Sequence, residues 1–267
     1  AGRWGWLESR VASRLEGLER GLRGKTRTIL VGRSPRFWMG LGVVGLVLLL
    51  AVLINVGRPL NQRYSAAEIS YFKEVAFGVD SRVDRFFVIR DVEPDRVDEL
   101  NKWSVDVRVH LAGYVSSADR AETESIVREL DELIEPISIS VVLDPGAANI
   151  QVWLVPRSDF DQYLPLQNTS EITGAGQLWA NDAGPATAVL LVASDQPDGA
   201  RWNTLREEIT QAFGLRHDSW RYPESVFYQG ENEALELLEI DRAIIRLMYE
   251  PEIENRMTLE DLKELGL

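Results

Sequence analysis

The chain has 267 residues and a mass of 30.2 kDa, and its 45% apolar and 27% charged residues are typical of one or two folded domains. It has no cysteine and only two histidines, which excludes disulfides, thiolate chemistry, iron–sulfur clusters and a three-histidine metal site. The net charge of −13 argues against a nucleic-acid partner.

An uncharged stretch divides the charge of the chain. Residues 1–36 carry a net charge of +6, residues 57–267 carry −19, and residues 37–56 carry no charged side chain. A helix of this length spans about 30 Å, the thickness of the hydrocarbon core of a bilayer. The sequence therefore predicts a transmembrane helix over residues 37–57. A buried helix of a soluble protein is the alternative, but few such helices are apolar on every face.

Basic residues are concentrated before this predicted span, and they set its orientation. Six of them lie close to it on that side: Arg20, Arg23, Lys25, Arg27, Arg33 and Arg36. The positive-inside rule places the N-terminus in the cytoplasm and the acidic remainder in the periplasm or the extracellular space, with the span in the cell inner membrane. A cleaved signal peptide is the competing interpretation, but its leading region would be 36 residues long. We therefore expect an uncleaved signal anchor.

Residues 1–36 predict a basic, cytoplasmic amphipathic helix. Apolar residues recur at spacings of three and four: Trp4, Leu7, Val11, Leu15, Leu18 and Leu22. Such a helix binds membrane lipids or packs on another subunit. In the span, Gly40, Gly42 and Gly45 match G-x-G-x-x-G literally, but no strand precedes them and a dinucleotide site is discarded. They are ordinary transmembrane glycines or a surface for a partner helix.

Residues 58–103 predict a membrane-proximal helix and a charged connector. Ser65 and Glu68 form a capping box at the start of that helix, and Gly78 ends it. The charged segment 80–102 contains a short apolar stretch whose structure the pattern does not decide.

Residues 104–267 predict an extracytoplasmic α/β (α+β) domain with a mixed sheet. Strands are expected at 104–111, 137–143, 150–155, 177–180 and 186–193. Helices are expected at 117–134, 201–213 and 237–249, and Thr258 with Asp261 opens a last one.

One motif suggests chemistry. The residues from Glu207 to His217 read E-E-I-T-Q-A-F-G-L-R-H and resemble the metzincin zinc-binding pattern H-E-x-x-H-x-x-G-x-x-H. Glu208, Gly214 and His217 match the general-base glutamate, the turning glycine and the third ligand. Glu207 and Gln211 stand in place of the first two histidines, so the zinc ligands are largely lost.

Several short segments in the same order resemble a bacterial domain family of unknown function with a metzincin-like plan. They are residues 71–78, 148–150, 207–215, 222–227 and 241–251, and Met248 stands at the place of the Met-turn. The resemblance covers residues 65–267. It implies a fold and not an activity.

The residue types weigh against a working zinc site, because zinc prefers nitrogen and sulfur ligands and glutamine is a poor one. If a metal bound, Glu207, Gln211 and His217 would hold a hard cation weakly, and Glu208 would be the catalytic residue of an active enzyme. The simpler interpretation is a solvated or hydrogen-bonded helix face. His110 and His217 are interpreted as structural or surface residues. We therefore expect no catalytic residue, no metal and no cofactor.

These observations favour a pseudoenzyme: a non-catalytic, membrane-anchored interaction module that stabilises a larger respiratory, photosynthetic or envelope complex. One alternative is a membrane-anchored, metal-dependent hydrolase or peptidase with an atypical site. Another is an envelope protein that binds a peptide or glycan. The last predicts an open cleft along the short strand at residues 177–180, where a peptide would add as a further strand.

Overall fold

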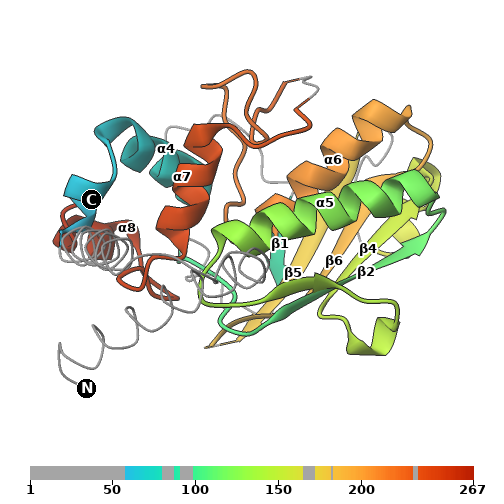
Figure 1. Cartoon of the computed structure of the whole chain (residues 1–267), viewed down its shortest axis with the longest axis horizontal. Coiled ribbons are helices and arrows are strands. Elements are labelled where there is room, and N and C mark those ends of the chain that lie inside the picture. Colours follow the sequence, from blue (N-terminus) through green and yellow to red (C-terminus); the bar gives the residue numbers. More distant parts are fainter. Residues whose placement is uncertain (1–57, 80–86, 91–98, 165–171, 182, 231–233) are drawn as a thin grey trace, which may run out of the picture. The chain divides into compact units, whose positions relative to one another are not determined.

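A computed structural model describes residues 58–79, 87–90, 99–164, 172–181, 183–230 and 234–267 (Figure 1). The predictions for residues 1–36 and for the span at 37–57, with its glycines, lie outside these residues. Within the described ranges, no helix has both the length and the apolar character needed to cross a membrane. The chain divides into two compact units, residues 1–63 and 64–267, and the described part of the first contains the short helix α3 (Leu60–Arg63).

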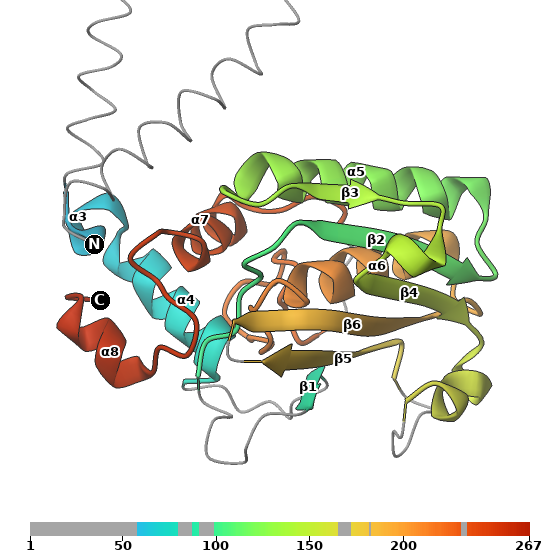
Figure 2. The same cartoon turned by 90° about the horizontal axis from the view of Figure 1, so that it is seen from below.

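The second unit is built on a six-stranded sheet with the order β1-β5-β6-β4-β2-β3 (Figure 2). The strands are β1 (Phe87–Arg90), β2 (Val107–Gly113), β3 (Ile139–Val141), β4 (Ile150–Val155), β5 (Gly174–Asn181) and β6 (Gly184–Ala193). Strands β6, β4, β2 and β3 are parallel, β5 is antiparallel to β6, and β1 is parallel to β5. The predicted α/β class with a mixed sheet is thereby confirmed.

Strand β2 shows how the sequence pattern becomes structure. Val107, Val109 and Leu111 are buried while Arg108 is exposed, as the alternation predicts. The strand begins three residues later than expected. Val105 continues the alternation in the sequence, but it precedes the first ladder pair and is 52% exposed.

Helices α5 (Ser117–Leu133) and α6 (Asp198–Gln211) lie side by side on one face of the sheet (Figures 1 and 2). Asp119 joins them. Its carboxylate closes the capping box of α5 with Ser116 and forms a 2.9 Å ion pair with Arg201 of α6. The indole of Trp202 donates to the same carboxylate oxygen at 3.1 Å. One buried acid thus caps one helix and holds the next.

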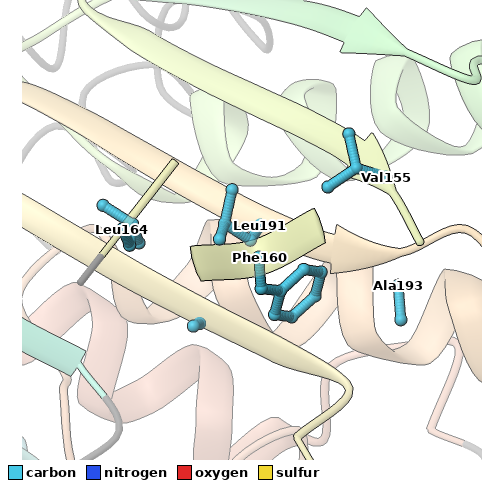
Figure 3. Close-up of a cluster of buried hydrophobic side chains, with 6 residues drawn as sticks. Val155, Phe160, Leu164, Leu191 and Ala193 are labelled. Carbon is cyan, nitrogen blue, oxygen red and sulfur yellow. The ribbon is translucent and has the colours of Figure 1, made fainter. Parts of the chain in front are cut away.

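The opposite face of the sheet is covered locally by the 3₁₀ helix Arg157–Gln162 and the residues after it (Figure 3). Phe160 and Leu164 pack on Val155, Leu191 and Ala193. Val155 pairs with Ala193 across β4 and β6, so their side chains share this face. Both faces of the central strands are therefore buried at this end of the sheet.

The remaining helices of the unit are α4 (Ala66–Phe77), α7 (Glu239–Met248) and α8 (Leu259–Glu264). The predicted capping boxes of α4 and α8 and the left-handed Gly78 at the end of α4 are confirmed. Tyr71 and Phe72 of α4 are fully buried. Helix α4 therefore belongs to the same compact unit as residues 104–267.

A buried hydrogen-bond chain links α4 to α7 through the segment 215–230. The Ser225 hydroxyl donates to Asp241 Oδ1 at 2.7 Å. The Ser225 hydroxyl has only one proton, and this bond uses it. The Tyr71 hydroxyl, 2.7 Å from Ser225 Oγ, is therefore the donor to Ser225. The pKa of Asp241 is raised, mainly because the group is buried. The hydrogen bonds from Ser225 and from two backbone amides oppose that shift.

The strand edge at which a peptide was expected to add near residues 177–180 is already occupied in the structure. Strand β5 pairs with β6 on one side and with β1 on the other, in the register Phe87–Gly176 to Arg90–Trp179. The apolar stretch in the charged connector, whose structure the pattern did not decide, supplies this strand. Its four residues are too few to show a clear alternation.

Candidate functional site

The C-terminal end of α6 carries the candidate site, and two aromatic side chains fix its position. The indole nitrogen of Trp103 donates to the carbonyl of Ala212 at 2.8 Å, and the Tyr249 hydroxyl donates to the carbonyl of Phe213 at 3.1 Å. These bonds satisfy carbonyl groups that the end of a helix leaves without a partner. The last turn of α6 is therefore held at a defined place.

Gly214 turns the chain immediately after α6. Its φ angle is +107°, and a Cβ atom there would lie 2.5 Å from both the Asn101 carbonyl oxygen and Met248 Cε. Only glycine fits this conformation and this space. The predicted turning glycine is confirmed, and the Met248 side chain packs directly against it.

The turn brings Asp218 back to α6, where it meets two residues of the motif. Gln211 Nε2 donates to Asp218 Oδ1 at 2.6 Å and lies 3.5 Å from Glu207 Oε1. The two carboxylate oxygens are thus no more than about 6 Å apart. Two ionised groups at that separation repel by on the order of 3 kcal/mol at an effective dielectric constant of about 20.

Protonation relieves this repulsion. Burial raises the pKa of Glu207 well above its ordinary value, and the negative charges of Asp218 and Glu208 raise it further. Burial likewise raises the pKa of Asp218 to about 6, although the hydrogen bond from Gln211 opposes the shift. These shifts favour one neutral acid at Glu207 over two negative charges that face the same amide.

Glu208 points away from solvent and against the sheet. Glu208 is 5% exposed, and a Cβ atom on Gly174 of β5 would overlap the Oε1 atom of Glu208. Its Oε2 atom is buried and accepts no hydrogen bond from any residue that the structure describes. Burial and then the charge of Asp218 raise its pKa well above the ordinary value, which favours the neutral acid at this position.

His217 lies on the other side of its segment. Its backbone amide donates to the Val75 carbonyl at 2.9 Å, and its imidazole packs on Gly78, where a Cβ atom would be 2.8 Å from Nδ1. Successive residues of an extended segment face opposite sides. Because His217 faces the end of α4, Asp218 faces α6.

Two further contacts fasten the segment to α4. The Ser219 hydroxyl donates to Glu74 Oε1 at 2.6 Å, and Arg221 forms a 2.7 Å ion pair with Glu74 Oε2. Arg221 also donates to the Ser70 hydroxyl at 3.0 Å. The segment 215–221 thus lies between α4 and α6 and is bonded to both.

The structure brings Glu207 and Gln211 together as their spacing predicts, and it places His217 against α4. The residues fit zinc poorly, since the histidine faces Gly78 and the rest of the set is a carboxyl and an amide. In the part of the chain that the structure describes, no three His, Asp or Glu side chains are placed to hold a metal ion. His110, predicted to be structural, lies 3.1 Å through Nδ1 from the Val142 carbonyl oxygen.

The sequence identifies Asp218 only as a neighbour of His217. The feature that could have predicted its role is the short extended stretch after Gly214. Adjacent residues of such a stretch face opposite sides, so one of His217 and Asp218 must face α6.

The fold and site define an α/β domain with a mixed sheet and a closed carboxyl–amide cluster at the end of one helix. The family described as "Protein of unknown function (DUF2927)" matches residues 66–265, and the chain belongs to this family. The expected membership of a family of unknown function is confirmed, while the metzincin-like plan stays a prediction.

The solved structures include two similar chains. One, described as "Structure of Myroilysin", is 13% identical and has a TM-score of 0.40, with 62% of this chain and 92% of that chain covered. The other, "Crystal structure of myroilysin", is 12% identical with a TM-score of 0.36, over 66% and 94% of the two chains. Comparison with curated proteins gives no match.

Proposed function

We propose that the chain is a non-catalytic interaction module with a metzincin-like plan, an accessory subunit that stabilises a larger membrane complex. Residues 37–57 anchor it, and the described unit lies on the periplasmic or extracellular side. One observation carries the non-catalytic part of the proposal: the Gln211 amide is shared by the Glu207 and Asp218 carboxyl groups. Among the described residues of the site, Glu207, Gln211 and Asp218 are thus engaged with one another.

The state of Glu208 supports the same conclusion. A general base must be ionised and must reach the proton that it removes. Glu208 is 5% exposed and lies against Gly174, and its burial raises its pKa well above the ordinary value, which favours the neutral acid. A carboxyl group in this state stabilises packing and does not activate water.

The accessory role is supported by features outside the described residues. Three glycines in the predicted span, Gly40, Gly42 and Gly45, give a partner helix room for close approach. The apolar stripe of the amphipathic helix predicted for residues 1–36 would offer a second contact on the cytoplasmic side. These surfaces favour protein partners within the membrane over a free enzyme.

The purified chain and its Glu208→Gln variant test the non-catalytic assignment. We expect less than one-tenth equivalent of zinc, manganese or iron per chain, and the same background hydrolysis of a mixed peptide library for both proteins. About one equivalent of zinc, together with peptide cleavage that the variant loses, would establish the alternative of an atypical metal-dependent hydrolase.

A further inference from the structure

The face of the sheet opposite α5 and α6 carries a row of apolar side chains that the candidate site does not use. Trp153 of β4, Val189 of β6 and Trp179 of β5 are half-buried and pack at the border of the apolar cluster under the 3₁₀ helix Arg157–Gln162. Trp153 pairs with Leu191 and Trp179 with Thr187, two alternate positions of β6 with Val189 between them. Alternate residues of a strand point to the same face. The three side chains therefore form one row across three strands, here called the tryptophan row, on the face that Figure 2 looks onto.

The length of the tryptophan row indicates the size of its ligand. The two tryptophans are in register with residues four apart on β6, and their strands lie on either side of it. From the spacing of strands and residues in a sheet, their Cα atoms are roughly 16 Å apart, the length of about ten residues of an α-helix. Tyr163 is 38% exposed, and its ring lies 4.9 Å from that of Trp153, so it widens this end of the row. The row thus suits an extended element of a macromolecule better than a small molecule.

Charge distinguishes this face from the rest of the unit. Residues 57–267 carry a net charge of −19, yet none of the six described strands contains an aspartate or a glutamate. Two acids, Asp159 and Asp161, stand at the border of the row on the 3₁₀ helix. The centres of protein interfaces are poor in charged residues and rich in tryptophan and tyrosine, and their rims are polar. A second copy of this acidic chain would be repelled, so charge complementarity favours a different protein with an apolar centre and a basic edge.

We propose that the tryptophan row is the docking surface for the protein partner of this chain. The partner places an apolar element on the row and basic side chains beside Asp159 and Asp161. This inference rests on the proposed accessory function and names the surface that performs it. Both indoles pack against the apolar cluster, which limits their movement before binding. Little side-chain entropy is therefore lost when a partner covers them.

Oxidative labelling of tryptophan tests whether a partner covers the row. The full chain is labelled within the complex solubilised from native membranes, and again when it has been overproduced and purified alone in the same detergent. We expect the labelling of Trp153 and Trp179 to be at least about threefold lower in the complex, because a docked partner excludes water from the centre of an interface. Trp220, which is 57% exposed and lies next to Arg221 on the segment bonded to α4, is the internal control and should be labelled equally in both samples. Equal labelling of the row in both samples would overturn the proposal.

The Thr187→Glu variant tests the row by a change at its edge. Thr187 is exposed and pairs with Trp179, so the free chain should tolerate the new carboxylate, whereas a docked partner would bury it. In size separation of solubilised membranes, we expect the fraction of the chain that migrates with its partner to fall at least about tenfold, because a buried charge without a partner is costly. Ser117→Glu adds the same charge at an exposed hydroxyl residue of α5, on the other side of the sheet, and should keep the wild-type fraction. Undiminished migration of Thr187→Glu with the partner would contradict the proposal.

The outcomes separate this inference from the proposed function. A wild-type chain that migrates without any partner contradicts the accessory function itself. A wild-type complex that Thr187→Glu leaves intact contradicts only the location of the docking surface. Protection of the row in a peak that contains only further copies of this chain, or protection that is lost when envelope glycan is digested, would assign the row to another occupant and overturn the proposal.

Discussion

At the residue scale, close packing at two glycines shapes the site. Gly214 lets the chain turn against Met248, and Gly174 lets the Glu208 carboxyl lie against the backbone of β5. A Cβ atom on Gly174 would also lie 2.6 Å from Thr204 Cγ2. The space for Glu208 therefore exists only because β5 has no side chain at this point.

The Gly174→Ala substitution should lower the free energy of unfolding by about 1 to 3 kcal/mol, the usual cost of forcing extra volume into a packed site. Urea denaturation monitored by circular dichroism measures the change. Adding Glu208→Ala should recover part of the loss because it removes one of the two clashing side chains. Gly199→Ala is the control: a Cβ atom there has no neighbour within 4 Å, and the change should be neutral or slightly stabilising. A Gly174→Ala variant as stable as the wild type would show that Glu208 lies elsewhere.

The residues of the site differed in how far the sequence predicted them. Glu207 and Gln211 are four apart on a helix, so their proximity follows from helical geometry alone. Asp218 comes from a non-helical segment, and His217 turns away because its neighbour faces α6. The orientation of such a segment depends on its contacts with α4, which no local pattern encodes.

At the element scale, α5, α6 and α7 are held by buried polar side chains as well as by apolar packing. Arg206 of α6 pairs with Glu122 and Glu129 of α5, and Arg242 of α7 pairs with the same Glu129. Arg201 and Asp119 form a second contact between α5 and α6. Single substitutions at these points leave buried charges without compensation, so they should cost more than surface substitutions.

The Asp119→Ala substitution removes the capping box of α5. It also removes the carboxylate that pairs with the buried guanidinium of Arg201. We expect a loss of about 3 kcal/mol or more at pH 7. Burial alone would raise the pKa of Asp119, but hydrogen bonds from Ser116, Arg201 and Trp202 lower it overall. The stabilisation is therefore present at neutral pH and is lost as the pH falls through that lowered value, so the cost of the substitution should shrink below pH 4.

Denaturation series at pH 7 and pH 3 provide this comparison. Asp198→Ala is the matched control, because Asp198 also pairs with Arg201 but its side chain is 68% exposed, and its loss should cost under about 1 kcal/mol. An equal cost for Asp119→Ala at both pH values would contradict the assigned role.

The end of α6 gives a further prediction. Tyr249→Phe removes the donor to the Phe213 carbonyl and the acceptor of the Trp103 amide, and it should cost about 1 to 2 kcal/mol in urea denaturation. Tyr114→Phe, at a 70% exposed tyrosine, should change stability by less than about 0.5 kcal/mol. A similar small effect at both positions would mean that Tyr249 does not hold the helix end.

Most elements of the sheet and its helices followed from local periodicity, and the exceptions have a physical reason. The alternation at β2 and the helical spacing at α5 are long enough to identify each element. Strand β1 has four residues, and its partner β5 lies almost ninety residues further along the chain. Its pairing depends on the assembled sheet, so a reading of nearby residues does not reveal it.

At the scale of the whole molecule, the chain joins a predicted anchor to a unit that begins at Tyr64. Residues 64–267 contain the complete sheet and its covering helices. We expect this fragment to unfold cooperatively and to stay in the supernatant when membranes are pelleted. If residues 37–57 span the bilayer as proposed, the full chain should pellet with membranes and resist carbonate extraction. A full chain released by carbonate would contradict the proposed anchor.

The central property proposed for this chain is that it acts through a partner. The direct measurement is mild solubilisation of native membranes, separation by size, and mass spectrometry with metal analysis of the fraction that contains the chain. We predict migration well above the 30.2 kDa of the single chain, with a partner in constant proportion across the peak and no stoichiometric metal. Migration as a free chain that carries about one zinc ion would contradict the account and would make Glu207, Glu208, Gln211 and His217 an active site.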